Sequence, residues 1–580
     1  MSGRISISSS HDQSRVFDSY LYQAYIVLFH SNRDTSLSLP FAQLQSMDTT
    51  KNFRSTYSIS SQIPLPLQIF VIAVVLTSIC CAFQRLYFHP LSKIPGPRLA
   101  AATSWYEFYY NAIRDGVYIR SFEKMHTDYN SSVVRIAPNH VHVNDPDFFS
   151  KMFNNRTIYR KDPGFYKQIS VSESILSILD PHEHRLRRQK VNSLFSIKAA
   201  DSMAPDIMAI AQKAANIMMK RGEEKRPIDM HRLCRSISSE VLFKILFDEP
   251  QDLLDSQEEH PDLLTSMDGF LKNFWLMKAF PAVGWLATNL PESLAQKAVP
   301  GFKSIRDKCG KWATMAVARQ NSREIAKNDS SSNTVFDLLL APTPEEPRSE
   351  FSIPDLVDEA FLFVFAGTDT TGSTIANALY YILSSASVSS NLLGELTSHG
   401  ITSHETFDCN LVQRLPYLTA VVKESMRVHT IVPGTLPRIV PEGGVVVDGH
   451  FIPAGTSISQ TNLSLHHNAS IFPSPEKFDP ERWLGDEKKV LEKYFAPFSK
   501  GSRSCLVTSF FQNDGVDQPA KQIFSLANEE IYIVVALFFS RFEMELYETD
   551  ARSMEWADRG NAVNRSAVKV LVKRDRWADN

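Results

Sequence analysis

The chain has 580 residues, of which 43% are hydrophobic and 22% are charged. This is the composition of a globular protein, and it excludes a wholly disordered, collagen-like or disulfide-scaffold chain. Lys and Arg number 61 against 64 Asp and Glu, so the net charge of −3 gives no general attraction to nucleic acid, and no nucleic-acid partner is expected. Length alone suggests about four domains.

Residues 1–61 are rich in serine and show no sustained hydrophobic period, which predicts a disordered N-terminal extension. Met47 lies within this stretch and offers an alternative translation start. With that start, the residues before it would be an artefact of the gene model, and the apolar segment that follows would become N-terminal.

An uncharged apolar run extends from Ile63 to Phe83. About 20 apolar residues in a helix cross the hydrocarbon core of a bilayer, so we expect a transmembrane anchor over 62–84. A signal peptide would be shorter and nearer the start, and a buried core helix is the other alternative. More basic residues follow the run than precede it, which favours a cytosolic C-terminal body.

The sequence after the anchor divides into a hinge and a body. Residues 85–100 contain several prolines and predict a stiff, extended hinge. Residues 101–580 show helical spacing with short loops, which predicts one large domain, mainly α with small antiparallel β-sheets. Within it we expect a hairpin over 133–145, a long helix with a disturbed centre over 354–383, strands over 443–458 and a buried helix over 531–539.

The segment FSKGSRSCL, which begins at Phe498, carries the decisive motif. Gly501 allows the backbone to approach a planar ligand, and Arg503 is placed to bind a carboxylate of that ligand. Cys505 would supply a thiolate, which as an axial ligand pushes electron density onto haem iron and favours O–O cleavage. The alternative role for Cys505 is that of a buried structural thiol. The four residues match the Phe-x-x-Gly-x-Arg-x-Cys signature, and the chain resembles the cytochrome P450 monooxygenases from about Leu86 to its C-terminus.

The second motif, AGTDTT, lies in the middle of the long predicted helix. Gly and Thr are poor choices for the interior of a plain core helix. Ala366 and Gly367 leave room beside the helix for a flat ligand and for dioxygen, and an acid followed by an alcohol can relay protons through water. The motif resembles the oxygen-activation sequence of the family, which implies Asp369 as the acid and Thr370 as the alcohol.

The sequence KESMR places Glu424 and Arg427 three residues apart, on one helix face where they can pair. Alone, such a pair on a surface helix carries little meaning. In the family, the arginine of a downstream PERW-type motif joins it. The resemblance therefore implies a buried triad of Glu424, Arg427 and Arg482 behind the haem, with a structural role.

The basic stretch HEHRLRRQKVNSLFS is, taken alone, a surface helix. The resemblance implies that His184 and Arg188 lie over the haem propionates. It also implies that Arg438, in TLPRIVPEGG, binds a propionate. Arg185 and Arg187 would be solvated, or would belong to a basic surface that docks an acidic reductase.

The family pattern breaks after Leu506, where residues 507–522 separate the motif from the helix that is expected to follow. This segment is either a real loop, which would disturb haem binding, or an unspliced intron. Valine codons begin with GT and a glutamine codon can be CAG, so both ends are compatible with intron borders. We favour the intron, and a transcript that retains the codons for 507–522 would contradict it.

The resemblance implies a membrane-anchored haem-thiolate monooxygenase that contains haem b and hydroxylates or epoxidises a lipophilic substrate with O2. No Gly-x-Gly-x-x-Gly nucleotide motif stands out, so electrons from NADPH would arrive through a separate NADPH-cytochrome P450 reductase, with cytochrome b5 as a further partner. The chain is most similar to the trichodiene oxygenase-like fungal group. This similarity implies a terpenoid or other secondary-metabolite substrate and a single-pass location in the endoplasmic reticulum membrane, with the catalytic domain in the cytosol.

Two alternatives remain open at this point. The insert could leave a catalytically impaired haem protein, or the chain could be a haem-thiolate isomerase that needs no reductase. The pair of Asp369 and Thr370 argues against the isomerase, because such an enzyme has no need of proton delivery to dioxygen. Dependence of activity on NADPH and a reductase would separate an isomerase from a monooxygenase.

Overall fold

The computed structural model describes residues 64–248, 251–254, 262–326, 334–341, 351–506 and 526–578. The chain divides into two compact units, residues 1–92 and 93–580. The extension expected over 1–61 and the insert expected over 507–522 lie outside the described residues.

The first unit contains the helix α2 (Leu65–Tyr87). Its 23 residues have a mean hydropathy of 2.3, and none of them is buried. By length and composition this helix could span a bilayer. No other helix in the described part of the chain meets the same criterion. The helix ends three residues later than the expected anchor, and turns follow it where an extended hinge was expected.

The second unit is mainly helical, as the sequence predicts. Its helices are α3 (Arg98–Ala102), α4 (Trp105–Phe108), η1 (Tyr109–Ile113), η2 (Ile119–Ser121), α5 (Phe122–Asp128), α6 (Pro146–Met152), α7 (Pro163–Tyr166), α8 (Pro181–Val191), η3 (Asn192–Phe195), α9 (Ile197–Glu223), α10 (Met230–Phe247), α11 (Asp262–Ala279), α12 (Pro281–Asn289), α13 (Glu292–Ala298), α14 (Phe302–Ala326), α15 (Val335–Leu340), α16 (Ile353–Leu383), α17 (Ala386–Ser398), α18 (Cys409–Val412), α19 (Pro416–Val428), α20 (Asn462–His466), η4 (Pro480–Trp483), α21 (Lys488–Tyr494), η5 (Gly501–Arg503), α22 (Leu526–Arg541) and η6 (Ala551–Met554). Its strands are β1 (Val133–Ala137), β2 (His140–Val143), β3 (Arg160–Lys161), β4 (Ile228–Asp229), β5 (Arg438–Ile439), β6 (Val445–Val447), β7 (His450–Ile452), β8 (Ser457–Ser459), β9 (Phe542–Leu546), β10 (Trp556–Asp558), β11 (Ala562–Asn564) and β12 (Lys569–Asp575).

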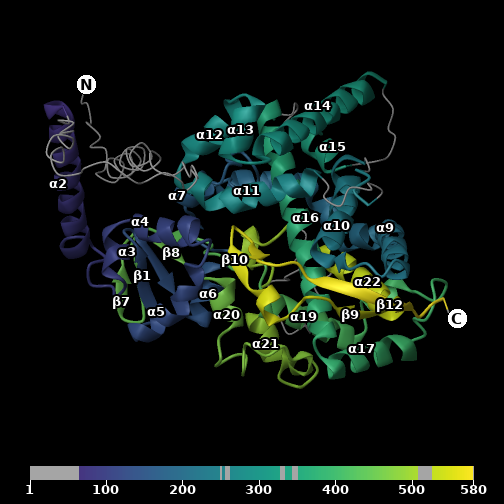
Figure 1. Cartoon of the computed structure of the whole chain (residues 1–580). Helices are drawn as coiled ribbons and strands as arrows, with labels where there is room; N and C mark the ends of the chain where they lie inside the picture. Colours follow the sequence, from purple (N-terminus) through teal and green to yellow (C-terminus); the bar gives the residue numbers. More distant parts are fainter. Residues whose placement is uncertain are drawn as a thin grey trace, which may run out of the picture. The chain divides into compact units, whose positions relative to one another are not determined.

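The helix α16 runs through the core of the second unit and packs against α10, α14, α19 and α22 (Figure 1). A capping box of Ser352 and Asp355 starts it. The disturbed centre that was expected is absent, because the threonine hydroxyls bond carbonyls one turn back without interrupting the helix. At Gly372 a Cβ would lie 2.6 Å from the Cα of Arg235, so the glycine allows α10 to approach closely.

Small sheets complete the second unit. A five-stranded sheet has the order β1-β2-β8-β5-β3, and a three-stranded sheet has the order β4-β12-β9. The predicted hairpin is confirmed as β1 and β2, which pair antiparallel. The pair β2 and β8 is parallel, which the sequence does not predict. The antiparallel pairing of β3 with β5 sets Lys161 opposite Arg438, which positions two cations for the site described below.

Candidate active site

The predicted thiolate loop is a tight turn. The Cys505 N–H donates to the carbonyl of Phe498 at 3.0 Å, and the Ser504 N–H donates to the carbonyl of Gly501 at 3.0 Å. Gly501 has a φ of 77°, and a Cβ there would lie 2.6 Å from the backbone of Asn154. The close backbone of Asn154 and the left-handed conformation are each sufficient to require a glycine here. The turn leaves Cys505 exposed.

Two arginines hold this loop to the rest of the second unit. Arg188 of α8 donates to the carbonyls of Ser504 at 2.6 Å and Cys505 at 3.2 Å. The guanidinium of Arg503 donates to the three consecutive carbonyls that precede α8, those of Ile178, Leu179 and Asp180. Both side chains were predicted to bind haem carboxylates. In the structure they also fix the cysteine loop against α8.

Four basic side chains gather at the same place. They are Lys161, Arg188, Arg438 and Arg503, and in the described part of the chain none of them forms an ion pair. Arg438 is 4% exposed, and its Nε and Nη1 have no hydrogen-bond partner among the described residues. Burial first, and then its like-charged neighbours, hold the pKa of Lys161 well below its usual range and lower that of Arg503 to about 10.

His184 lies buried against this cation cluster. Burial and then the charges of Arg503, Lys161 and Arg188 lower its pKa to about 2. The imidazole is therefore neutral at physiological pH and can donate one N–H without adding a further positive charge. A cluster of this kind matches a ligand that brings negative charge.

The predicted oxygen-activation residues lie in the middle of α16. Ala366 is exposed although most residues around it are buried, and the hydroxyl of Thr370 one turn later donates to its carbonyl at 2.8 Å. Gly367 faces α10, where a Cβ would lie 2.8 Å from Leu242 Cδ1. Its small size therefore serves helix packing, whereas the sequence suggests room for a flat ligand. Ala366 and Thr370 share the accessible face.

Asp369 is buried and has two close partners. Its Oδ1 lies 3.1 Å from Arg235 Nε, and its Oδ2 accepts the side-chain N–H of Asn561 at 2.8 Å. Arg235 is shared, because its Nη1 lies 2.7 Å from Asp268 Oδ1. Sequence reasoning missed Arg235, Asn561 and Lys161, since each is a single residue outside any motif.

The predicted buried triad is present as geometry. Glu424 and Arg427 are both 0% exposed and are joined by two hydrogen bonds of 2.8 and 2.9 Å. Arg482 Nε donates to Glu424 at 3.0 Å, and Trp483 Nε1 and the Asp479 N–H each donate to the same carboxylate at 2.9 Å. One carboxylate thus accepts five hydrogen bonds, which compensates for the burial of its charge.

Comparison with known proteins decides the family of this chain. The model of the family described as cytochrome P450 matches residues 112–510. The chain belongs to the cytochrome P450 family. It is similar to the cytochrome P450 monooxygenase ankB of Aspergillus thermomutatus, with 38% identity over 85% of this chain and 91% of that protein. It is also similar to the cytochrome P450 monooxygenase phqM of Penicillium fellutanum, with 39% identity over 84% of this chain and 88% of that protein.

Solved structures agree on the fold. The heme domain of cytochrome P450DA has a TM-score of 0.64 and 14% identity, over 83% of this chain and 98% of that chain. The chain is therefore a cytochrome P450 monooxygenase, and its family implies a haem with a thiolate ligand to iron. As a family, P450 enzymes also work with a redox partner and a lipophilic substrate.

Arg187 of this P450 is placed differently from the expectation of a solvated or reductase-docking residue. Its Nη1 lies 3.0 Å from Oε1 of Glu359, whose side chain is 0% exposed. Burial raises the pKa of Glu359 to about 7, against the opposing effect of Arg187. Only Arg185 of the two arginines is exposed. The basic pattern of α8 did not reveal that one of its arginines pairs with a carboxylate far away in the sequence.

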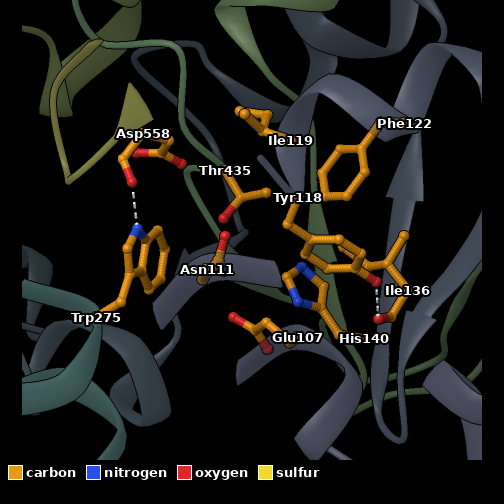
Figure 2. Close-up of a pocket in the computed structure, with 10 residues that line it drawn as sticks. All are labelled: Glu107, Asn111, Tyr118, Ile119, Phe122, Ile136, His140, Trp275, Thr435 and Asp558. Carbon is orange, nitrogen blue, oxygen red and sulfur yellow. Dashed lines mark hydrogen bonds between the residues drawn. The ribbon is translucent and has the colours of Figure 1, made fainter. Parts of the chain in front are cut away.

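A small cavity of about 20 Å³, lined by both polar and apolar side chains, contains none of the predicted site residues (Figure 2). Its wall includes Asn111, Glu107 and Asp558, and the Oδ1 of Asn111 has no protein partner among the described residues. The indole N–H of Trp275 donates to the Asp558 carbonyl at 2.6 Å beside it, as Figure 2 shows. The volume suits a single water molecule and excludes an organic substrate.

Proposed function

We propose that Cys505 is the thiolate ligand of haem b and that the cluster of Lys161, Arg188, Arg438 and Arg503 binds the two haem carboxylates. The observation that carries this proposal is a group of four basic side chains beside the cysteine loop that form no ion pair among the described residues. Haem b supplies a dianionic edge and an iron that accepts a thiolate, so the residues present fit the group. Arg438 and the neutral His184 would complete the hydrogen bonds to the carboxylates.

Bound haem would supply oxygen activation, and the residues of α16 would manage protons and water. Thr370 offers the lone pairs of its hydroxyl to the accessible side, because its proton is donated to Ala366. Asp369, the residue before Thr370, is held in place by Arg235 and Asn561. To act as the acid, Asp369 has to exchange one of these partners for water, so Arg235 and Asn561 would control when it does.

We propose that the substrate is a lipophilic small molecule, a terpenoid or another intermediate of fungal secondary metabolism. Fungal monooxygenases among the similar proteins support this. Electrons would come from NADPH through a separate NADPH-cytochrome P450 reductase, with cytochrome b5 as a further partner. The α2 helix would anchor the enzyme in the endoplasmic reticulum membrane with its catalytic domain in the cytosol. Expression with a reductase, followed by product analysis on terpenoid intermediates, tests the substrate class.

We propose that the chain consists of an N-terminal extension, an anchor that ends at Tyr87, a short connector and one haem domain over 101–580, and that residues 507–522 derive from a retained intron. Support comes from the family match, which ends at residue 510, inside that segment. Sequencing the transcript tests the intron. If the purified 580-residue chain shows a full thiolate band in the carbon monoxide difference spectrum, residues 507–522 are a real loop that is compatible with haem binding.

Arg438→Leu tests the anionic ligand directly. In the haem-free chain we expect the free energy of unfolding to rise by about 1–3 kcal/mol, because a buried guanidinium with unpartnered nitrogens is removed. In the haem-loaded protein we expect faster loss of haem to apomyoglobin, because one carboxylate partner is lost. Urea unfolding and haem transfer measure the two effects.

The control for this pair of measurements is Arg438→Lys, which keeps the charge and should retain haem better than the leucine variant. If Arg438→Leu destabilises the haem-free chain and leaves haem retention unchanged, Arg438 serves folding alone and the carboxylate assignment is wrong.

Asp369→Asn tests the acid. We expect product formation to fall by about 10²-fold with an unchanged haem spectrum, since a general acid contributes about 10²–10⁴-fold. The fold should tolerate the change, because Arg235 keeps its contact with Asp268. Turnover in H2O and D2O with the reductase measures the effect, and Asp268→Asn is the matched control that leaves the Asp369 carboxylate in place. Turnover of Asp369→Asn equal to that of the wild type would remove Asp369 from proton delivery.

A further inference from the structure

The segment 170–180, which lies between α7 and α8, is bound at several backbone groups by charged side chains from other elements. On the α16 side, Asp358 Oδ2 accepts the N–H of Glu173 at 3.1 Å, and Glu359 Oε1 accepts the N–H of Ile175 at 2.9 Å. Both carboxylates come from the N-terminal half of α16, upstream of the predicted oxygen-activation residues. We name this segment the strap.

Each of the two carboxylates is paired with an arginine that also donates a hydrogen bond to a backbone carbonyl of the strap. Arg187 of α8 lies 3.0 Å from Glu359 Oε1 and donates to the carbonyl of Glu173 at 2.7 Å. Arg306 of α14 lies 2.9 Å from Asp358 Oδ1 and donates to the carbonyl of Ser170 at 3.2 Å. Two carboxylates and two guanidinium groups thus hold the strap backbone. Because each carboxylate pairs with one guanidinium, their opposite charges compensate for the free energy of burying them.

The other end of the strap is held by the cation cluster. Lys161 donates to the carbonyl of Leu176 at 2.5 Å, and Arg503 donates to the carbonyls from Ile178 to Asp180. Ile175 and Ile178 are buried. The strap therefore spans from α16 to the cysteine loop, and its position is set from both ends.

From these contacts we propose that Glu359 and Asp358 are positioning residues that fix the strap, and through it the surroundings of the proposed haem site. The backbone placement rests on the described contacts alone, whereas the effect on ligand binding rests on the proposed haem site. Loss of Glu359 would free the Ile175 N–H and leave Arg187 without its buried partner, so the middle of the strap would open first.

The first test is hydrogen exchange of the full chain, which requires no haem. In Glu359→Leu we expect the amides of 171–178 to exchange at least 10-fold faster than in the wild type, and in Glu359→Gln, which keeps an acceptor, about 3-fold faster. Asp337→Asn is the matched control, because Asp337 is a buried carboxylate 3.2 Å from Arg319, and the described hydrogen bonds of its side chain go to Thr334 and not to the strap. Unchanged exchange over 171–178, or the same increase in Asp337→Asn, would overturn the proposal.

The second test separates positioning from general stability. In haem-loaded protein, the absorbance change is titrated with imidazole and with the bulkier 4-phenylimidazole. We expect Glu359→Gln to change the affinity for 4-phenylimidazole at least 5-fold while the affinity for imidazole stays within 2-fold. Equal changes in affinity for both azoles would reject the effect of the strap on ligand binding. If the wild type shows no haem spectrum at all, the proposed haem site fails, and the exchange experiment still decides whether Glu359 holds the strap.

Discussion

Replacing Cys505 with serine is expected to abolish the thiolate band in the reduced carbon monoxide difference spectrum and to reduce turnover to the background rate. A serine hydroxyl does not ionise at neutral pH and cannot push electron density onto iron as a thiolate does. The variant should keep its fold, because Cys505 is exposed and the turn is built from backbone hydrogen bonds and from Arg188 and Arg503. The carbon monoxide difference spectrum of the purified variant tests the loss of the thiolate band, and its circular dichroism tests whether the fold is kept.

The other body cysteines provide the control. Burial holds the pKa of Cys234 well above its usual range and raises that of Cys309 to about 12 and that of Cys409 to about 11. These thiols stay protonated at neutral pH and are poor iron ligands. Cys409→Ser should therefore leave the spectrum unchanged. A thiolate band that survives Cys505→Ser and disappears in Cys409→Ser would reassign the ligand.

Replacing Glu424 with alanine is expected to cost about 3–5 kcal/mol of folding free energy, the cost of breaking a buried ion pair. The change strands Arg427, which is 0% exposed, and removes the acceptor for Arg482 and Trp483. Since domains of ordinary stability unfold with about 5–15 kcal/mol, this loss would consume a large part of the total. Urea unfolding monitored by tryptophan fluorescence measures it.

Two further variants keep this prediction decisive. Glu424→Gln retains acceptor atoms and should cost less than alanine, which gives a measurable value where the alanine variant does not fold. Glu492→Gln is the control, because Glu492 forms a 2.7 Å ion pair with Lys423, which lies on α19 beside Glu424. Both side chains of this pair are about a quarter exposed, so its loss should cost less than about 1 kcal/mol of folding free energy. Similar costs for Glu424→Gln and Glu492→Gln would contradict a special role for the triad.

The placement of predicted residues shows where sequence reasoning works. Phe498, Gly501, Arg503 and Cys505 are near neighbours in the chain, and the structure places them in one turn. Glu424 and Arg427 are i,i+3 on one helix and pair as predicted. In both cases the geometry follows from local backbone conformation, which short motifs specify.

The reasons for particular residues were harder to predict. Gly501 is required by the backbone of Asn154, and Gly367 is required by Leu242 of α10. Arg187 looked like a solvated residue of a basic helix, yet it pairs with Glu359. Each partner lies far away in the sequence, so the contact exists only after the helices pack.

The sequence by itself determined the family, the helical class, the candidate anchor and the residues of the thiolate motif, because these depend on hydrophobic period and on local spacing. Three contacts became visible only in the folded chain: Lys161 joins Arg188, Arg438 and Arg503 in one cation cluster, Arg235 and Asn561 hold Asp369, and two carboxylates of α16 hold the strap. Charges from distant segments become neighbours through strand pairing and helix packing. Their interaction grows once burial removes the water between them, and no local pattern records it.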